Sequence, residues 1–353
     1  MAKGTEVSMD VLLIGAGMVA QTHVLALRDN TEDLRLVSVL GRDQTRTAAF
    51  CAQASETIGS QVDAFIDLDD SLATRPDMAI LITPPNARID YAKALAQAGI
   101  PTLMEKPLER TLPAATEVVD AFARAEVPAG VCFQHRTRAA SQALKAHLDA
   151  GDLGQIVHVE IRVPWWRDQA YYDAPGRGSY ERDGGGVMIN QAIHSLDLAL
   201  WLAGPVAQVQ AQMRTTPLHQ MEAEDIATAL LKFRSGATGV LSASTAAYPG
   251  GPESIALTTA HAQVLLQGDT LQIDWHDGRQ DVIAPDDNTG TGGGADPMAF
   301  SHGWHQSVIE DFARSVKTGT SPLAPAQEAL HVHAVIHAME QATQSATLTN
   351  VPT

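Results

Sequence analysis

The stretch that decides the fold reads Met9-Asp10-Val11-Leu12-Leu13-Ile14-Gly15-Ala16-Gly17-Met18-Val19-Ala20. Its first half is a short apolar run that predicts a buried strand, and the Gly-x-Gly-x-x-Ala that follows opens a helix expected at 18–28. The first glycine permits a tight turn, the second lets a phosphate approach the backbone, and the small third residue lets the helix pack on the strand. The turn therefore predicts a dinucleotide site, formed by Gly15, Gly17, Met18 and Val19.

Further apolar runs alternate with helical patterns up to about residue 130. Because the strands are continuously apolar and separated by helices, they predict a doubly wound parallel sheet that binds its ligand at the carboxyl ends of the strands. The expected strands are 9–14, 34–40, 62–66, 78–82, 102–104 and 130–133, and the expected helices are 18–28, 44–54, 88–98 and 111–125.

Beyond residue 130 the pattern becomes α+β, with strands joined by short turns that predict a large, mostly antiparallel sheet. We therefore expect a dinucleotide-binding domain at 1–130 and a domain for substrate binding and oligomerisation at 131–353. Residues 288–296 are rich in glycine and predict a loop. The expected helices are 139–150, 186–202, 304–317 and 324–342, and the expected strands are 156–163, 206–214, 226–233, 237–244, 254–260, 263–266 and 271–275.

Charge and composition exclude several classes of function. The 353 residues carry a formal charge of −17 and the pI is near 5.1, which disfavours nucleic acid or an anionic membrane as the main partner. The cysteines, Cys51 and Cys132, have no disulfide or zinc spacing, and His333 and His337 lack a carboxylate that would complete a metal motif, so no metal is predicted. No signal peptide or membrane span is indicated, and we expect a cytoplasmic protein.

The end of the second predicted strand bears on the choice of cofactor. It reads Leu40-Gly41-Arg42-Asp43, where an acid would be expected to bind the free 2′-hydroxyl of NAD. Gly41 and Arg42 instead suit the 2′-phosphate of NADP, which is the predicted cofactor. NAD stays the alternative, because Asp43 can turn back to a ribose and Arg42 can face solvent.

Two segments at later strand ends are rigid because of proline. Thr83-Pro84-Pro85-Asn86 either ends its strand for local reasons or lines the cofactor. In Glu105-Lys106-Pro107, a lysine follows a buried strand and is held by the next proline, so we expect Lys106 to do chemistry rather than to form a surface pair with Glu105.

These motifs, with Gly151-Asp152-Leu153-Gly154 and with Gly184-Gly185-Gly186 before His194, resemble the Gfo/Idh/MocA family of glucose-fructose oxidoreductase and inositol dehydrogenase. The resemblance covers essentially the whole chain. It implies that Lys106 and His194 are catalytic, that the second domain contacts the substrate, and that its open sheet face makes oligomer contacts in a homodimer or homotetramer. Besides the glycine turn, Gly41 and Arg42, the predicted cofactor-binding residues are Thr83, Pro84, Pro85, Asn86, Glu105, Lys106 and Gln134.

Elementary chemistry agrees with this pair of residues. Oxidation of a secondary alcohol requires hydride transfer to nicotinamide and removal of the hydroxyl proton. His194 can accept a proton near neutral pH. Lys106 either stays charged and stabilises the developing alkoxide, or has a pKa low enough to let it transfer the proton itself. In a regular helix over 186–202, Asn190, His194 and Asp197 share one face. Compared with the family, Asn190 replaces a frequent aspartate, and Arg88 replaces a histidine that often follows the Thr83–Asn86 turn.

A further segment rich in aromatic residues predicts the substrate. Trp165-Trp166-Arg167-Asp168 and Tyr171-Tyr172 present flat amphipathic side chains that either stack on a sugar ring or form an oligomer interface. There are two interpretations of the segment Gln134-His135-Arg136. It either contacts the nicotinamide or the substrate, or it forms a hydrogen bond between the domains. The predicted substrate-binding residues are Lys106, Trp166, Arg167, Tyr172, Asn190 and His194.

Together these features predict an NAD(P)-dependent oxidoreductase acting on a hydroxyl of a sugar, sugar derivative or cyclitol. One alternative is a regulatory protein of the same fold that senses NAD(P) without turnover. Another is a reductase of bilins or imines, which would need a more apolar pocket.

Overall fold

The computed structural model describes residues 8–284 and 301–352, which divide into two compact units. Residues 302–328 belong to the first unit although they follow the second unit's sheet in the chain. The predicted domain limits, 1–130 and 131–353, and their separate roles stay predictions. The described residues of the first unit are 8–109, 113–134 and 302–328, and those of the second are 110–112, 135–284, 301 and 329–352.

Two sequence predictions concern other features of the chain. The glycine-rich segment 288–296 lies outside the described residues. Within the described ranges, no helix combines the length and the apolar character that a membrane span requires.

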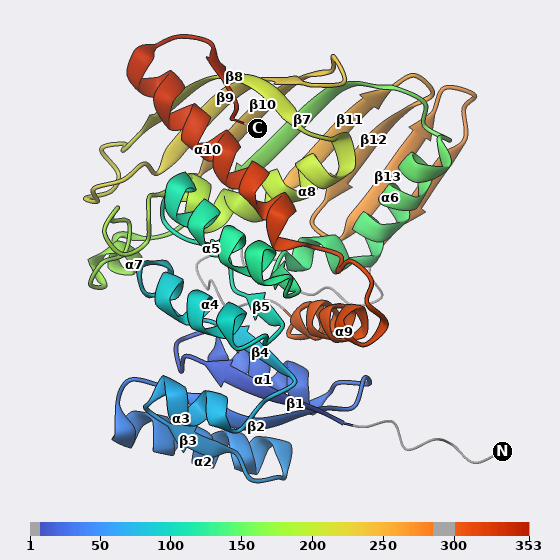
Figure 1. Ribbon diagram of the computed structural model, residues 1–353. Helices are drawn as coiled ribbons and strands as arrows, with labels where there is room; N and C mark the ends of the chain where they lie inside the picture. Colours follow the sequence, from blue (N-terminus) through green and yellow to red (C-terminus); the bar gives the residue numbers. More distant parts are fainter. Residues whose placement is uncertain (1–7, 285–300, 353) are drawn as a thin grey trace, which may run out of the picture. The chain divides into compact units, whose positions relative to one another are not determined.

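The first unit is built from short parallel strands and the helices between them, and its elements follow the predicted order (Figure 1). Its elements are β1 (Met9–Ile14), α1 (Ala20–Arg28), β2 (Leu34–Leu40), α2 (Gln44–Ile58), β3 (Asp63–Phe65), α3 (Leu68–Ala73), β4 (Met78–Leu81), η1 (Pro85–Ala87), α4 (Arg88–Gln97), β5 (Thr102–Met104), α5 (Leu112–Ala125), β6 (Ala129–Val131) and α9 (Gly303–Thr318).

The six strands form one sheet in the order β3-β2-β1-β4-β5-β6, and every neighbouring pair is parallel. The strand order reverses between β1 and β4, the position at which doubly wound sheets bind their ligands. Because all strands run in one direction, the segments that follow β1, β2, β4 and β5 emerge at the same edge of the sheet. The predicted doubly wound fold is confirmed.

The second unit contains a larger sheet, with helices α6 and α8 on one of its faces (Figure 1). Its elements include η2 (Gln134–Thr137) from residue 135 on and α10 (Ala326–Ser345) from residue 329 on. The others are α6 (Ala139–Ala150), β7 (Ile156–Pro164), α7 (Gln169–Asp173), η3 (Met188–Ala192), α8 (Ile193–Ala203), β8 (Val206–Arg214), β9 (Ile226–Phe233), β10 (Thr238–Ser244), β11 (Ser254–Thr259), β12 (Ala262–Gln267), β13 (Thr270–Trp275), β14 (Gln280–Ile283) and β15 (Thr349–Asn350).

Nine strands form this sheet in the order β14-β13-β12-β11-β7-β10-β9-β8-β15. Only the β7/β10 pair among them is parallel, so the predicted mostly antiparallel sheet is confirmed. Buried and exposed residues alternate along β9 and β12, as expected for a sheet that is covered on one face.

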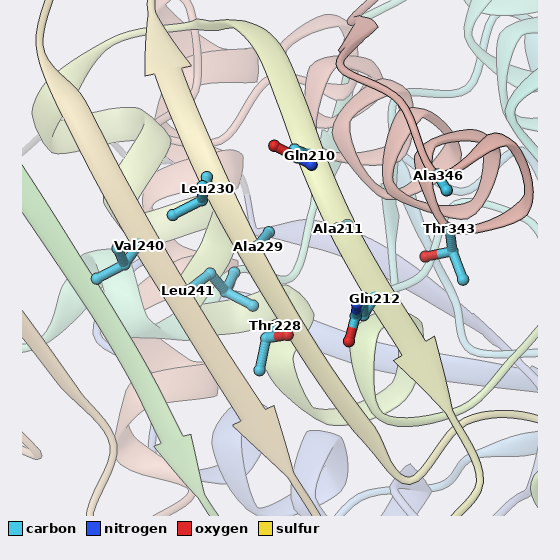
Figure 2. Close-up of a pocket in the computed structure, with 10 residues that line it drawn as sticks. All are labelled: Gln210, Ala211, Gln212, Thr228, Ala229, Leu230, Val240, Leu241, Thr343 and Ala346. Carbon is cyan, nitrogen blue, oxygen red and sulfur yellow. The ribbon is translucent and has the colours of Figure 1, made fainter.

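The open face of this sheet carries a row of side chains that is mostly apolar but includes Glu160, Gln210 and Gln272. Leu230 and Val282 are more than half exposed, at 58% and 59%. A hollow of about 480 Å³ lies among β8, β9, β10 and the end of α10, and Figure 2 shows Leu230 and Val240 on neighbouring strands there. Strand pairing arranges the row as Gln210, Leu230, Val240, Glu160, Ala256, Leu265, Gln272 and Val282.

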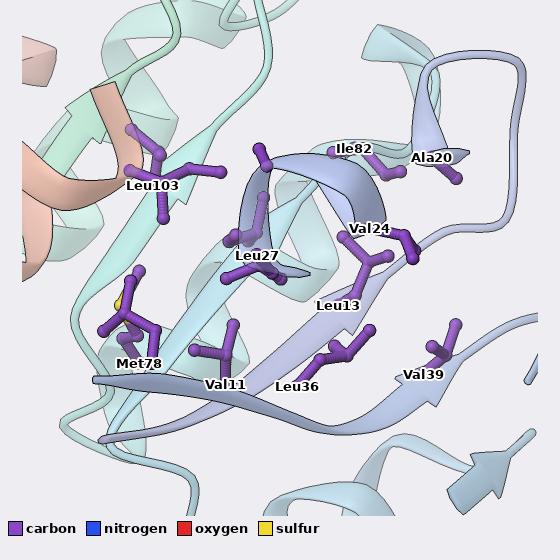
Figure 3. Packing of buried hydrophobic residues seen from close by; sticks show 14 of the residues in the cluster. Val11, Leu13, Ala20, Val24, Leu27, Leu36, Val39, Met78, Ile82 and Leu103 are labelled. Carbon is purple, nitrogen blue, oxygen red and sulfur yellow. The ribbon is translucent and has the colours of Figure 1, made fainter. Parts of the chain in front are cut away.

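The core of the first unit lies between its sheet and helices α1 and α9. Figure 3 shows Val24 and Leu27 of α1 over Val11 and Leu13 of β1. From α9, Phe312 joins the same cluster and is 1% exposed. After α9 the chain pairs with the outer strand β6, where the Val131 N–H donates to the Ala324 carbonyl at 2.9 Å, so the edge of the sheet is covered.

The structure corrects one predicted element and adds others. The helix predicted over 186–202 is a π-helical segment, η3, followed by the α-helix α8. The aromatic segment contains the short helix α7, for which no helix was predicted. The elements α3, β14 and β15 were not predicted.

Candidate active site

The turn after β1 has the geometry that a dinucleotide pyrophosphate requires. Gly15 has a φ of 115°, and a Cβ there would lie 3.0 Å from Cγ1 of Ile82. A Cβ at Gly17 would meet no atom of the described residues within 4 Å, so the backbone at Gly17 borders open space at the start of α1. Met18 is exposed and Val19 half-buried beside it. The turn fits an anionic group at the N-terminus of the helix.

At the end of β2, a small residue and an exposed arginine come together. A Cβ on Gly41 would lie 2.0 Å from Oγ1 of Thr47, so close packing with α2 requires glycine there. Asp43 caps α2, because its Oδ1 accepts the Arg46 N–H at 2.8 Å. Arg42 is exposed beside this cap. Of these two charged groups, Asp43 is engaged as the helix cap, while Arg42 is exposed.

The segment after β4 contains the predicted Thr83–Asn86 turn. Thr83 is buried, Pro84 and Pro85 are half-buried, and Asn86 is exposed. The short helix η1 follows and leads directly into α4, whose first residue is Arg88.

Arg88 joins the segments that follow β4 and β5. It is 1% exposed, and its Nη2 donates to the Thr83 carbonyl at 2.6 Å. Its Nη1 donates to the carbonyls of Glu105 and Pro107 and lies 3.4 Å from that of Leu108. Burial lowers the pKa of Arg88 to about 10, which still leaves the guanidinium charged at neutral pH. One buried cation thus fixes the backbone on both sides of Lys106.

The Glu105 side chain is held separately by histidines. His23 Nε2 lies 3.0 Å and His305 Nε2 lies 3.4 Å from Glu105 Oε1, and Oε2 accepts the Lys106 N–H at 3.1 Å. Burial alone would raise the pKa of Glu105, but the bonds from His23 and His305 outweigh it and hold that pKa well below its usual value. Burial also lowers the pKa of His305, against the effect of Glu105.

In the part of the chain that the structure describes, one group of metal-ligating side chains brings its donor atoms within 4.8 Å of one another: His23, Glu105 and Cys132. Burial, with Glu105 second, raises the pKa of the Cys132 thiol well above its usual value. The Glu105 carboxylate of this group accepts the Lys106 N–H and lies within hydrogen-bond distance of His23. The group is a hydrogen-bonded network that supports Glu105.

The predicted residues of the first unit therefore meet at one sheet edge. Lys106 is half-buried there and follows β5, next to the strand β4 that precedes Thr83. Gln134 is buried just after β6, the next strand of the sheet.

In the second unit, Glu224 positions the start of the segment that carries His194. Its Oε2 accepts the Gly186 N–H and its Oε1 the Met188 N–H, both at 3.0 Å. A Cβ on Gly186 would lie 1.8 Å from the Glu224 carbonyl oxygen, so only glycine allows this approach. These contacts lie at the beginning of η3, and π-helical turns are frequent at functional sites.

Three residues of this segment were predicted to share one face. The Asn190 side-chain amide donates hydrogen bonds to the carbonyls of Gly185 and Gly186, at 2.8 and 3.1 Å. Asp197 forms a buried bidentate ion pair with Arg136, at 2.7 and 2.9 Å. His194 instead stacks on another histidine ring and is 6% exposed. The three side chains thus have separate partners.

The aromatic segment is organised around His219. The rings of Trp166 and Tyr172 lie 5.9 and 4.9 Å from the His219 ring. The Tyr172 hydroxyl lies 2.6 Å from Oγ1 of Thr245, and burial raises its pKa above the usual value. Arg167 lies between two rings, 5.5 Å from that of Trp165 and 5.7 Å from that of Tyr171.

This segment also touches the helix that carries His194. Gln191 Nε2 donates to the Tyr171 hydroxyl at 3.3 Å. The predicted substrate residues Trp166, Arg167 and Tyr172 thus lie in one cluster with Tyr171 and His219. Gln191 joins this cluster to the segment of the second unit that also carries Asn190 and His194.

Sequence reasoning missed the residues that hold these groups. Arg88 was noticed without a role, and His23, His305 and Glu224 were not singled out. Arg88 offers no local signal of its role, because it is the first residue of α4, and His305 lies 200 residues from Glu105 in the sequence.

Comparison with known proteins now identifies the family. The model of the oxidoreductase family with an NAD-binding Rossmann fold matches residues 9–133, and the model of the GFO/IDH/MocA C-terminal domain matches residues 141–264. The chain belongs to the Gfo/Idh/MocA family. It is therefore an NAD-binding oxidoreductase, and the resemblance noted in the sequence is confirmed.

Three relatives illustrate the similarity. The myo-inositol dehydrogenase Hyg17 of Streptomyces leeuwenhoekii is 30% identical over 240 residues, which cover 67% of this chain and 69% of that protein. The rhizopine catabolism protein MocA of Rhizobium meliloti is 26% identical over 243 residues, covering 67% and 72%. The WlbA dehydrogenase of Bordetella pertussis, solved with NADH and UDP-GlcNAcA, aligns with a TM-score of 0.81 at 27% identity, covering 98% of this chain and 100% of that chain.

The burial of His305 makes the first unit sensitive to acid. Because the folded-state pKa of His305 lies below its ordinary value, the unfolded chain binds this proton first, and stability is lost as the pH falls below about 6.5. We expect the free energy of unfolding to fall by about 1 kcal/mol more in the wild type than in His305→Gln between about pH 7.5 and pH 5.5, measured by urea denaturation. His147→Gln, at a half-buried histidine of the second unit, is the control. If the free energy of unfolding falls equally in the wild type and in His305→Gln, the effect assigned to His305 is contradicted.

Proposed function

We propose that the protein is a dehydrogenase that moves a hydride between nicotinamide and a hydroxyl-bearing carbon of a sugar, sugar derivative or cyclitol. The observation that carries the proposal is the fixation of the Lys106 backbone by Arg88 and Glu105 at the same sheet edge as the glycine turn. A lysine held in this way is pre-organised for chemistry rather than for solvation.

The turn at Gly15 and Gly17 would hold the pyrophosphate, and the segment after β4 would line the cofactor. When bound, the oxidised dinucleotide accepts the hydride that leaves the substrate carbon. The hydroxyl proton must leave as the carbonyl forms, and this proton is the task of the protein's own side chains.

We assign this task to Lys106 and His194. His194 accepts the hydroxyl proton, and Lys106 stabilises the charge that develops on the oxygen. In the reverse direction His194 returns the proton. Asn190 cannot act as a base, and its amide is already engaged with two carbonyls, so it serves to hold the turn before His194.

The substrate class is supported by the aromatic segment and by the relatives. Trp166 is half-buried, and Tyr171 is half-buried and carries Arg177 over its ring at 5.1 Å. Such amphipathic faces stack on sugar rings and leave hydroxyls for polar partners. Related dehydrogenases are named for inositol and for D-glucosides, which are polyhydroxylated rings.

A lysine variant tests the mechanism. We expect Lys106→Met to lower kcat by a factor of about 10³ while the Kd of the dinucleotide changes by less than about threefold, because the lost group acts on the reacting oxygen. The assay follows reduced nicotinamide absorbance with a panel of cyclitols, polyols, aldoses and sugar acids. Lys93→Met, an exposed lysine of the same unit, is the control.

Near-normal turnover of Lys106→Met would refute the assignment. If no compound in the panel is turned over although the dinucleotide binds, the protein would instead match the sensing alternative.

For the cofactor we propose NADP, with NAD as the alternative. Asp43 is occupied as the cap of α2, which leaves the exposed Arg42 beside glycine as the available group for a 2′-substituent. NADH is present in the solved WlbA complex, so both cofactors need to be compared.

Arg42→Ala tests this choice. A charge-assisted contact to phosphate contributes about 1.5–3 kcal/mol, so kcat/KM with NADP should fall about tenfold or more, and with NAD by less than about threefold. Arg35→Ala, at the other end of β2, is the control. Equal losses with the two cofactors would favour NAD.

We also propose a homodimer or homotetramer that forms through the open sheet face. The mostly apolar row that includes Leu230, Val240 and Val282 would be covered in such an assembly. Sedimentation equilibrium tests this, and a monomeric mass at micromolar concentration would contradict it. The cytoplasmic location stays a prediction.

A further inference from the structure

The second unit contains a second buried histidine beside His194. The rings of His135 and His194 are stacked, with centroids 4.8 Å apart and an angle of 26° between their planes. His135 is 3% exposed. The sequence left its role open, and the proposed mechanism does not use it. Two histidines in contact would ordinarily compete for the same proton near neutral pH.

The contact with Arg138 determines which of the two histidines can accept the proton. Its Nη2 lies 2.8 Å from Nε2 of His135. A guanidinium has only donors, so this ring nitrogen must accept, and the proton of the neutral ring is on Nδ1. Protonation of His135 at Nε2 would place two N–H groups and two positive charges against each other. Arg138 therefore keeps His135 neutral.

Arg138 itself is firmly held. It is 1% exposed, and its Nη1 lies 2.6 Å from Glu253 Oε1 and 3.2 Å from the Gly268 carbonyl. The Trp165 indole N–H donates to Glu253 Oε2 at 3.3 Å. Asp269 also interacts electrostatically with this cation. Since the buried charge of Arg138 is balanced, the guanidinium can stay against His135.

The residue next to His135 fixes the same helix. Arg136 holds Asp197 through two hydrogen bonds, and Asp197 lies one turn beyond His194 on α8. Successive residues of η2 thus contact successive turns of α8, one through a ring stack and one through an ion pair. The plane of the His194 ring and the rotation of α8 are set together.

We propose that His135 is a positioning residue for His194, kept by Arg138 as a neutral ring that orients His194 and leaves it the sole proton acceptor of the pair. The inference rests on the proposed function, because it assumes that His194 takes the hydroxyl proton. It adds a residue that fixes the base and excludes a competing site of protonation.

The tautomer is tested directly by NMR. In the full chain with bound dinucleotide and labelled histidine, His135 should show the Nδ1–H form, unchanged from roughly pH 6 to pH 8. The His135→Phe spectrum assigns the signal. An Nε2–H tautomer, or titration to the doubly protonated ring in this range, would overturn the inference.

Kinetics test the positioning role. We expect His135→Ala to lower kcat about tenfold or more with KM changed by less than about threefold, because the loosened base affects the reacting geometry. His135→Phe keeps a flat ring and should recover most of the loss. His147→Ala, at a histidine that contacts Trp275 on the same unit, is the control.

A kcat of His135→Ala within about twofold of the wild type would refute the inference. The His194→Gln variant separates the two levels of the argument. If His194→Gln keeps turnover, the proposed mechanism itself fails, whereas an inactive His194→Gln with an unaffected His135→Ala refutes only the positioning role.

Discussion

The interaction on which the rest of the site depends is the contact of the buried Arg88 guanidinium with main-chain carbonyls from two strand ends. The carbonyl of Thr83 follows β4, and those of Glu105 and Pro107 follow β5. The Glu105 N–H still donates to the Leu81 carbonyl of β4 at 2.9 Å, but the carbonyls of Thr83, Glu105 and Pro107 lie beyond the paired strand residues. Buried carbonyls left without a donor cost about 1–3 kcal/mol each. A single planar cation with several donors satisfies them at once and gives Lys106 a fixed backbone.

The same principle recurs in the second unit, where fixed charges orient the groups that we assign to chemistry. Glu224 organises the backbone before His194 through two N–H groups, and Asp197 ties α8 to Arg136. In the first unit, His23 and His305 hold the carboxylate of Glu105, the residue that precedes Lys106. Hydrogen bonds to each buried charge fix the geometry around it, although burial still lowers the pKa of Arg88 and raises that of Glu224.

The sequence predicts the sheet of the first unit closely, because buried parallel strands are continuous apolar runs and β1, β2 and β5 have the predicted limits. The sequence-based prediction fails where contacts between residues distant in the sequence determine the local structure. The π-helical turn η3 depends on the close approach of Glu224 to Gly186. The position of α9 depends on Phe312, which packs in a core formed by residues that are distant in the sequence. Lys106 and His194 were recognisable by motif, whereas the partners of Arg88 are carbonyls, which leave no pattern in the sequence.

The most direct test of this account replaces Arg88 and follows both the backbone and the reaction. Hydrogen exchange of residues 104–110, read by mass spectrometry with dinucleotide bound, should be at least about tenfold faster in Arg88→Met, and kcat should fall by a similar factor. Arg88→Lys keeps a charge but has one nitrogen, so it should recover only part of the loss, and Arg35→Met should behave as the wild type. Unchanged exchange and turnover in a folded Arg88→Met protein would contradict the claim that this cation fixes Lys106.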